Sequence, residues 1–207
     1  MSALDTTSPR VLEGLPFESY VDMPETSATS LKDILVSPLL YHYRQSAPRP
    51  DTDTLRQGRL CHAAVYEPDT LPLRYSVWPS HGADGKKQNR VGQKWEAFVT
   101  ANTGRTVVTE EQYRTAVRLR DAVHRHPVAG KLLAEIGRAE LSITWMHERT
   151  GIRIKSRFDW LCSALTDLKT ARDVSRQAFE GACIRYGYAL QFALYHDGAV
   201  KIGAGPL

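Results

Sequence analysis

Two stretches in the second half of the chain alternate apolar and polar residues, and this pattern constrains the fold more than any other feature. Residues 138–146 form the first stretch and residues 152–160 the second. Alternation with a period of two is typical of β-strands that bury one face. The short turn at residues 149–151 contains a glycine, so the two stretches are predicted to form an antiparallel hairpin. A third strand is expected over residues 165–170.

Helical patterns surround the predicted hairpin. Ser30 is a candidate N-cap for a helix that Pro38 divides in two, with Ser37 capping the second part. Residues 109–112 have the sequence of a capping box and predict a helix to about His124. Further helices are expected over residues 54–66, 95–101 and 175–195, the last bent near Gly187, and from Pro127 onward, with short strands at 75–78 and 107–108.

This order of elements predicts an α/β protein with a mixed central β-sheet flanked by helices. Residues 1–29 are rich in Ser, Thr, Pro and acidic residues, and they are expected to form a flexible N-terminal arm. Residues 30–207 are then expected to form a single domain. Within it, the polar, basic and glycine-containing residues 79–92 are the expected flexible loop.

The composition narrows the class of protein. Apolar residues make up 42% and charged residues 24% of the 207 residues, as in soluble globular proteins. Neither a signal peptide nor a membrane segment is expected, because the sequence lacks the apolar runs that either requires. The three cysteines are unclustered, which argues against a disulfide framework or a zinc site and fits the cytoplasm. The net charge of +4 is compatible with a polyanionic partner without establishing one.

Three residues near the end of the hairpin have chemistry that suits phosphodiester hydrolysis. Asp159 ends the second strand, and Asp167 and Lys169 are two apart on the third, so their side chains are expected to converge. Carboxylate oxygens suit Mg²⁺, and packing like charges without a cation is unfavourable. A lysine can orient or deprotonate an attacking water, or stabilise charge on a phosphate. The same spacing also occurs on ordinary solvated strands, so alone it does not identify a catalytic site.

Two groups of basic residues are candidates for contacts with a DNA backbone. The first group shares the strand face of Asp159, and the second lies in the expected flexible loop. Each is also compatible with an ordinary solvated surface. The groups are Arg153, Lys155 and Arg157, and Lys86, Lys87 and Arg90.

Arg157-Phe-Asp159 followed by Asp167-Leu-Lys169-Thr170 resembles the motif of the PD-(D/E)XK nucleases, in which Asp and Asp/Glu-x-Lys occupy adjacent strands. Further motifs resemble one branch, the RecE-type (exonuclease VIII-like) phage and prophage exonucleases. They occur in the family's order over residues 27–198: Ser30-Leu-Lys32, Ser37-Pro38-x-x-Tyr41, Gly58-Arg-Leu-Cys-His62, Glu140 with Trp145, Tyr186-Gly-Tyr188, Gln191-x-x-x-Tyr195 and Asp197-Gly198. The resemblance implies a restriction-endonuclease-like core.

The resemblance also implies roles for individual residues. Catalytic roles fall to Lys169, Asp167, Asp159, Glu140 and Gln191, and the implied metal ligands are His62, Asp159, Asp167 and the carbonyl of Leu168. The implied DNA contacts are Ser30, Arg157, Gln191 and Tyr195, with Ser30 placed to bind a terminal 5′-phosphate at a helix start. Ordinary alternatives stay open: a helix histidine, a solvated strand glutamate, a polar residue beside a core aromatic, and an N-cap serine.

The function that the resemblance implies is a Mg²⁺-dependent or Mn²⁺-dependent 5′-to-3′ exodeoxyribonuclease acting on the ends of linear double-stranded DNA. Its products would be 5′-mononucleotides and a 3′ single-stranded overhang. The resemblance further implies phage-type homologous recombination beside a single-strand annealing protein, and a ring-shaped homo-oligomer. Two alternatives stay open: another nuclease of this superfamily, single-strand or structure-specific, and a catalytically weak scaffold that binds DNA ends.

Overall fold

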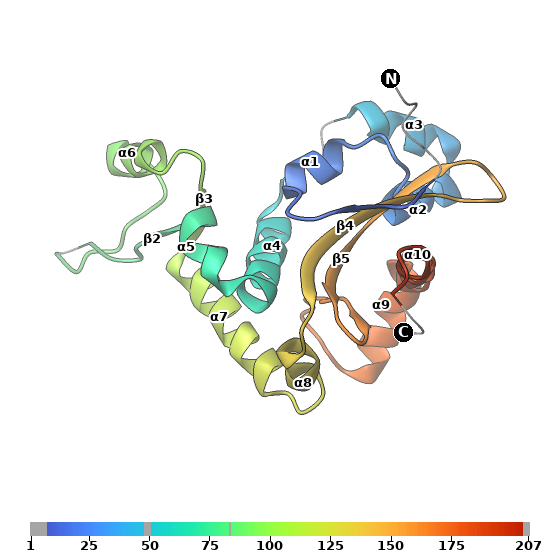
Figure 1. Cartoon of the computed structure of the whole chain (residues 1–207). Coiled ribbons are helices and arrows are strands. Elements are labelled where there is room, and N and C mark those ends of the chain that lie inside the picture. The colour runs from blue at the N-terminus through green and yellow to red at the C-terminus, as the bar shows by residue number, and fades with distance from the viewer. Residues whose placement is uncertain (1–7, 48–50, 83, 205–207) are drawn as a thin grey trace, which may run out of the picture. The chain divides into compact units, whose positions relative to one another are not determined.

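The computed structural model describes residues 8–47, 51–82 and 84–204, and the chain divides into two compact units. Unit 1 comprises residues 1–50 and 135–207, and unit 2 comprises residues 51–134. Each unit has its own apolar core, and Figure 1 shows the elements that build them. No helix in the described ranges is long and apolar enough to cross a membrane.

The predicted hairpin is present in unit 1. It consists of β4 (Arg138–Met146) and β5 (Arg153–Leu161), which pair antiparallel with Trp145 opposite Ile154. Gly151 in the connecting turn has a φ of 66°, a left-handed conformation that glycine adopts without steric cost. The hairpin is therefore encoded locally, by alternation on both strands and a glycine between them.

Two short strands complete the sheet of unit 1, in the order β1-β4-β5-β6. β1 (Arg10–Leu12) pairs antiparallel with β4, and β6 (Leu165–Thr166) pairs antiparallel with β5. In addition, Thr26 forms an isolated parallel bridge to Ile154. The fold is thus mixed α/β, with a sheet flanked by helices, as the sequence predicts.

Helices lie on both sides of this sheet. α10 covers the apolar face, since Tyr195 and Ala199 belong to the same buried core as Ile143 and Phe158. On the other face the Lys155 ammonium donates hydrogen bonds to three backbone carbonyls at the end of α1. The helices of unit 1 are α1 (Phe17–Asp22), α2 (Ala28–Val36), α3 (Pro38–Ser46), α9 (Arg176–Arg185) and α10 (Tyr188–Lys201).

Part of the stretch that was expected to be a flexible arm has regular structure. Within residues 1–29, the described residues from Arg10 onward contain β1 and α1, and residues 1–7 lie outside the described residues. Long-range contacts order this segment: the Thr26 amide donates to the Arg153 carbonyl, and the Lys155 amide donates to the Thr26 carbonyl. Local composition does not reveal such contacts.

Three local details differ from the sequence prediction. The N-cap of the first predicted helix is Ser27, whose side chain accepts the Ser30 amide, so Ser30 lies within the first turn. The third strand ends at Thr166, because the Leu168 amide donates to the Asp159 carboxylate instead of to a neighbouring strand. The long C-terminal helix is interrupted at Gly187, whose φ is 60°, and it resumes as α10.

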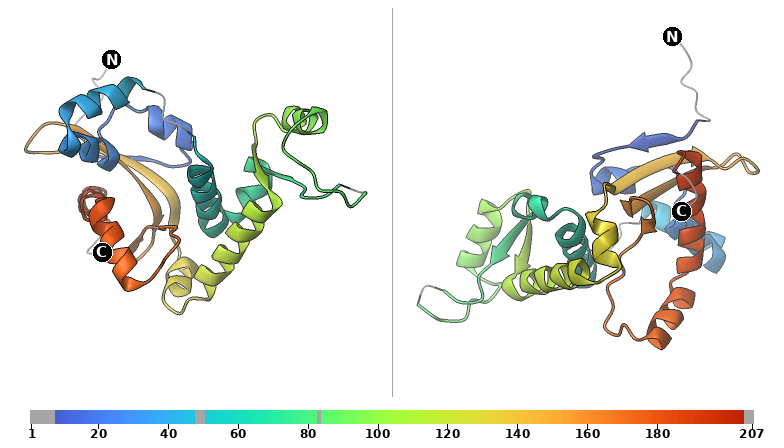
Figure 2. Two further views of the ribbon diagram at one scale, coloured as in Figure 1. Left: turned by 180° about the vertical axis from the view of Figure 1, so that it is seen from behind. Right: turned by 60° about the horizontal axis from the view of Figure 1, so that its bottom comes forward.

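Unit 2 is built on two packed helices and a small parallel sheet (Figure 2). Buried residues of α4, among them Leu60 and Ala64, share a core with Val108 and Ala116. The sheet pairs β2 with β3 in parallel. The elements are α4 (Asp53–Tyr66), a 3₁₀ turn (Pro68–Thr70), α5 (Leu71–Arg74), β2 (Tyr75–Trp78), α6 (Gln93–Ala101), β3 (Thr106–Thr109), α7 (Glu110–Arg125) and α8 (Ala129–Ala134).

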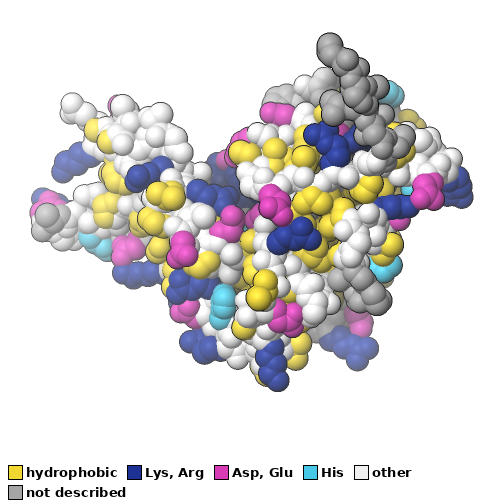
Figure 3. Space-filling view, viewed as in Figure 1, with side chains coloured by type: hydrophobic (Ala, Val, Ile, Leu, Met, Phe, Trp, Pro, Cys, Tyr) yellow, Lys and Arg dark blue, Asp and Glu magenta, His cyan; other side chains and the backbone are white. Residues whose placement is uncertain are grey.

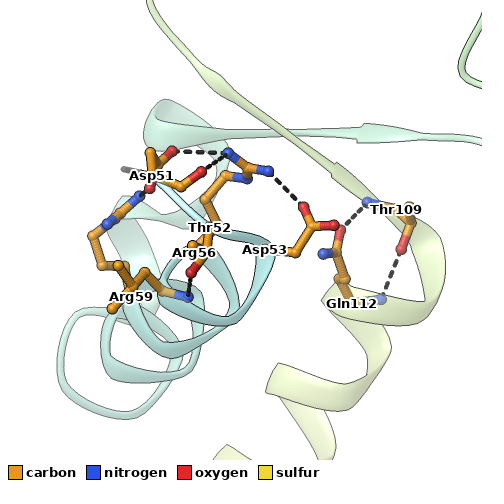
Figure 4. Close-up of polar contacts among 8 residues, drawn as sticks. Asp51, Thr52, Asp53, Arg56, Arg59, Thr109 and Gln112 are labelled. Carbon is orange, nitrogen blue, oxygen red and sulfur yellow. Dashed lines mark hydrogen bonds and ion pairs between the residues drawn. The ribbon is translucent and has the colours of Figure 1, made fainter. Parts of the chain in front are cut away.

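Caps and ion pairs define the starts of the two long helices of unit 2 (Figure 4). The predicted capping box is present: the Gln112 amide donates to the Thr109 hydroxyl, and the Gln112 side chain accepts from the Thr109 amide. At the start of α4, Arg56 forms ion pairs with Asp51 at 2.9 Å and with Asp53 at 2.5 Å. Such caps typically contribute about 1 kcal/mol each.

Candidate active site

Asp159 lies near the end of β5, next to the buried Phe158. Its residue is 7% exposed, and its Oδ2 accepts a 2.7 Å hydrogen bond from the Leu168 amide. This bond connects the end of β5 to the segment that follows β6, which turns back beside it. The sequence predicts this neighbourhood, although the connection is a side-chain-to-backbone bond and not a strand ladder.

Asp167 and Lys169 lie just beyond β6. The Asp167 side chain is 1% exposed, and its Oδ1 accepts a 3.1 Å hydrogen bond from the Gln191 side-chain amide. Its other oxygen, Oδ2, forms an ion pair with the Lys169 ammonium that lacks aligned hydrogen-bond geometry. The structure therefore brings the predicted Asp-x-Lys pair together without a strand at these positions.

Gln191 and Tyr195 occupy one face of α10, as their spacing predicts. The Gln191 amide nitrogen donates both to Asp167 and to the Tyr195 hydroxyl, the latter at 2.9 Å. The Tyr195 ring packs edge-on against Phe158 of β5 with 5.2 Å between ring centroids. Burial raises the pKa of Tyr195 well above its ordinary value of 10.0, with nearby Asp167 adding to the shift. Tyr195 is thus a neutral hydroxyl that accepts from Gln191, and Gln191 connects α10 to Asp167.

The two aspartates form a region of concentrated negative charge. Burial, followed by the charge of Asp167, raises the pKa of Asp159 well above its ordinary value of 3.8. The charge of Glu140 adds to the shift, whereas the Leu168 amide and the Lys169 ammonium oppose it. The Lys169 ammonium therefore offsets only part of the effect that burial and the neighbouring carboxylates have on Asp159.

Glu140 lies across the hairpin from Asp159. The register pairs residues on either side of these two, but Glu140 has a φ of 50°, the one left-handed non-glycine residue in the described part of the chain. This conformation costs about 1–2 kcal/mol. A carboxylate oxygen of Glu140 lies within 4.8 Å of one of Asp159. Backbone strain at a cluster of acidic side chains is frequent at functional sites.

The acidic residues of unit 1 fit a divalent metal ion. Asp159, Asp167 and Glu140 supply carboxylate oxygens, the ligand type that Mg²⁺ and Mn²⁺ take in proteins. Buried like charges raise one another's pKa, and a bound cation would relieve the repulsion. The raised pKa of Asp159 has this cause in part, so the donor chemistry and the electrostatics agree.

Three of the residues predicted to contact DNA line one cavity of unit 1. The cavity has a volume of about 610 Å³, and Ser30, Gln191 and Tyr195 are among its walls. Ser30 is 7% exposed, and its hydroxyl lies 3.1 Å from that of Ser27. The Ser156 hydroxyl, which has no hydrogen-bond partner among the described residues, belongs to the same lining.

The remaining predicted residues lie as follows. The Arg157 side chain is 13% exposed and donates hydrogen bonds to Glu140, to the Leu15 carbonyl and to the Ser142 hydroxyl. These contacts hold the guanidinium within the fold of unit 1. His62 lies on α4 in unit 2, where its ring packs 6.1 Å from that of Tyr66.

Two residues near the site, Tyr188 and Lys32, have no role in the sequence predictions. The Tyr188 ring lies beneath the Lys169 ammonium, whose nitrogen is 5.1 Å from the ring centroid. Lys32 on α2 has a pKa below its ordinary value of 10.5, owing first to burial and then to the charge of Lys169, with Asp167 acting in the opposite direction. Both belong to quoted motifs, Ser30-Leu-Lys32 and Tyr186-Gly-Tyr188, which is the signal that could have identified them.

Comparison with known proteins assigns the chain to a family. A search of curated proteins returned no match. The family model described as a PDDEXK-like domain of unknown function (DUF3799) matches residues 27–203, which is most of the chain. This match covers part of each sequence segment of unit 1 and all of unit 2. A PDDEXK-like domain suggests a nuclease that depends on a divalent metal ion. The chain therefore belongs to this PDDEXK-like domain family.

Proposed function

We propose that the protein is a divalent-metal-dependent 5′-to-3′ exodeoxyribonuclease. It degrades linear double-stranded DNA from its ends to 5′-mononucleotides and leaves a 3′ single-stranded overhang. The observation that carries the proposal is the chain of contacts from Asp159 through the Leu168 amide to Asp167, and from Asp167 to Lys169 and Gln191. Carboxylates that can hold a divalent cation, with an ammonium beside them that can stabilise developing charge, suit metal-assisted phosphodiester hydrolysis.

The acidic residues would hold the metal. Asp159, Asp167 and Glu140, with the Leu168 carbonyl and His62 as further ligands, form the proposed ligand set. A divalent cation bound there, Mg²⁺ with Mn²⁺ as a substitute, would supply Lewis acidity and a water nucleophile at neutral pH.

Lys169 has the role of placing positive charge beside the reacting phosphate. Its ammonium is paired with Asp167 and lies over the Tyr188 ring, which restricts its position. An ammonium held by a carboxylate is a hydrogen-bond donor, so it stabilises charge that develops on phosphate oxygens. Gln191 holds Asp167 from the other side and keeps the carboxylate oriented.

Ser30, Gln191, Tyr195 and Arg157 are the proposed DNA contacts of unit 1. Ser30 would bind the terminal 5′-phosphate in the cavity that it lines with Gln191 and Tyr195. We further propose a cytoplasmic role in phage-type recombination, beside a single-strand annealing protein and as a ring-shaped homo-oligomer. These last proposals rest on the resemblance to RecE-type exonucleases.

The experiment is digestion of a 5′-phosphorylated linear duplex labelled at either end, with Mg²⁺ or with EDTA. We expect Mg²⁺-dependent release of the 5′ label as mononucleotide, and a decrease in kcat of at least about 100-fold in Lys169→Ala, as for loss of a charge-stabilising donor. Lys201→Ala is the matched control, because Lys201 also pairs with a carboxylate, that of the exposed Glu148. Its activity should equal that of the wild type.

The other outcomes separate the alternatives. Cleavage of an unbroken circular duplex, or of single strands only, would replace the exonuclease by another nuclease of the superfamily. Binding to DNA ends without cleavage in Mg²⁺ or Mn²⁺ would leave a scaffold protein and contradict the proposed activity.

A further inference from the structure

The positive charge of the chain is unevenly distributed. Residues 51–134, which form unit 2, contain 13 Lys and Arg and 9 Asp and Glu, whereas the residues of unit 1 contain 14 of each. The entire net charge of +4 therefore belongs to unit 2. Basic side chains lie over β2, α6 and α7 on the face shown in Figure 3. An excess of this kind is what a polyanionic partner recognises.

Several cations of unit 2 are paired with carboxylates, whereas three lysines gathered in one segment, like Arg118, Arg125 and Lys131 on α7 and α8, form no ion pair with a described residue. Arg56, Arg59, Arg74 and Arg114 form ion pairs with carboxylates of the same unit. By contrast, Lys86, Lys87 and Lys94 are exposed, and none of them forms an ion pair with a residue that the structure describes. An unpaired ammonium group keeps its full positive charge for a ligand, whereas the charge of a paired arginine is largely neutralised by its carboxylate.

These three lysines belong to the loop between β2 and α6 and to the first turn of α6. The loop is closed by backbone hydrogen bonds from the Gln88 amide to the Ser80 carbonyl and from the Gly82 amide to the Lys86 carbonyl, both 2.9 Å. His81 and Lys87 form a β-bridge. The loop extends away from α4 and α7 in both views of Figure 2. The residues predicted from sequence to be the flexible loop thus include a closed turn that presents its lysines to solvent.

An aromatic cluster attaches α6 to β2. Trp78 at the end of β2 packs edge-on against Trp95 and Phe98 of α6, with ring centroids 5.2 and 5.1 Å apart. No residue of α6 is buried, so the helix adds little to the core of unit 2. Aromatic contacts of this kind contribute packing energy, and here they hold α6, the helix that carries Lys94, against β2.

We propose that the loop between β2 and α6, with the first turn of α6, binds the phosphate backbone of duplex DNA without sequence preference. Lys86, Lys87 and Lys94 supply the charge. The binding surface consists of residues of unit 2 alone, distinct from the acidic cleavage residues of unit 1. The inference rests on the proposed function, because it takes DNA as the polyanion and names a surface through which the nuclease binds it. An ammonium recognises phosphate as a point charge, so binding depends on backbone charge and not on base sequence.

The test measures binding apart from cleavage. The affinity of the full chain for a labelled duplex is measured in EDTA between 50 and 200 mM salt, for two duplexes of unrelated sequence. Each phosphate contact contributes about 0.9 to the slope of log K against log salt. The variant Lys86→Gln/Lys87→Gln/Lys94→Gln should therefore have a slope smaller by about two to three, equally on both duplexes.

The matched control is Arg118→Gln/Arg125→Gln/Lys131→Gln. It removes the same charge from exposed residues of α7 and α8 in the same unit. Its slope should stay within one unit of the wild type. A loop variant with the wild-type slope, or a control with the same decrease, would overturn the inference, as would a wild type without salt-dependent binding. A wild type that binds DNA but does not cleave it in Mg²⁺ would instead contradict the proposed function.

Discussion

In the candidate site, the buried Asp159 carboxylate is held close to other carboxylates. Asp159 is 7% exposed, accepts a backbone hydrogen bond, and lies in the field of Asp167 and Glu140. Burial and like charge both disfavour the carboxylate form. Keeping Asp159 ionised without a cation therefore lowers the free energy of unfolding, and this loss depends on pH.

Asp159→Asn should change how stability depends on pH in the absence of metal. The unfolded chain releases this proton near pH 3.8, whereas the folded chain keeps it up to the raised pKa. The folded state binds more protons in that interval, so the free energy of unfolding falls as pH rises through it. The Asn variant should lack this decrease and be more stable than the wild type at neutral pH, as measured by urea unfolding in EDTA from pH 4 to 8.

The exposed Asp22 provides the control for this experiment, because Asp22→Asn should follow the wild-type pH profile. Added Mg²⁺ should stabilise the wild type and the control at neutral pH, and should leave Asp159→Asn unchanged. Equal stabilisation of the Asn variant by Mg²⁺ would remove Asp159 from the ligand set.

Tyr195→Phe should cost about 1 kcal/mol of unfolding free energy, the net value of a typical hydrogen bond. The variant keeps the ring packing against Phe158 and loses only the acceptor of the 2.9 Å bond from Gln191. Tyr186→Phe is the control, since Tyr186 is 53% exposed and its stability should not change. Chemical denaturation of both variants checks this, and an unchanged Tyr195→Phe would show that the hydroxyl does not help to hold Gln191.

Among the secondary-structure elements, α10 connects the core to the site. Its Gly198 lies so close to β4 that an added Cβ would lie 2.5 Å from Ile143 Cδ1 and 2.8 Å from the Trp145 ring. The indole nitrogen of Trp145 in turn donates a 2.8 Å hydrogen bond to Asp197 of α10. The helix is therefore held against the strand at close range, which positions Gln191 and Tyr195 one to two turns earlier.

Gly198→Ala should destabilise the protein by about 1–3 kcal/mol, because overpacking a tight contact forces backbone or side chains to shift. Gly181→Ala is a control of opposite sign. Gly181 lies inside α9 with nothing within 4 Å of its added Cβ, so alanine should stabilise by about 0.5–1 kcal/mol through helix propensity. Thermal unfolding of both variants measures the two effects, and a neutral Gly198→Ala would contradict the close packing of α10 on β4.

Elements with local signals could be predicted from the sequence. The hairpin, the cap at Ser37 and the capping box at Thr109 and Gln112 each depend on residues within a few positions of one another. Long-range contacts decided the rest: Lys155 and the Thr26 backbone order the N-terminal segment, and Asp159 takes the amide that a third strand would have used.

The same limit applies to the candidate site: its local pairs could be predicted from the sequence, and its long-range contacts could not. The spacing of Asp167 and Lys169 and that of Gln191 and Tyr195 each place two side chains together locally. The contact between the pairs, from Gln191 to Asp167, spans 24 residues and has no local signal. The strained backbone of Glu140 and the proximity of Lys32 to Lys169 likewise arise only in the folded chain.

At the scale of the whole molecule, the chain has two separate apolar cores, one in each unit. The buried cluster around Leu60 and Val108 belongs entirely to unit 2, and the cluster around Trp145 and Phe158 entirely to unit 1. The net charge of +4 resides in unit 2, whereas the acidic residues of the candidate site belong to unit 1. The proposed backbone-binding lysines therefore belong to unit 2, whereas the proposed cleavage residues and the proposed contacts to the DNA end belong to unit 1.

If His62 is a metal ligand together with Asp159, as proposed, metal binding must link the stabilities of the two units. A ligand that binds only the folded state stabilises it by about 2.7 kcal/mol at a concentration 100 times its Kd. Mg²⁺ should then increase the hydrogen-exchange protection of α4 amides in unit 2 as well as that of β5 amides in unit 1. In His62→Ala the increase in α4 should disappear while part of that in β5 remains, because the carboxylates still bind the ion.

The increment between EDTA and Mg²⁺ is the quantity to compare, since removing His62 also removes its ring contact with Tyr66 and changes the starting stability of α4. His81→Ala, an exposed histidine of the same unit, should keep both increments. An α4 increment in His62→Ala equal to that of the wild type would remove His62 from the ligand set.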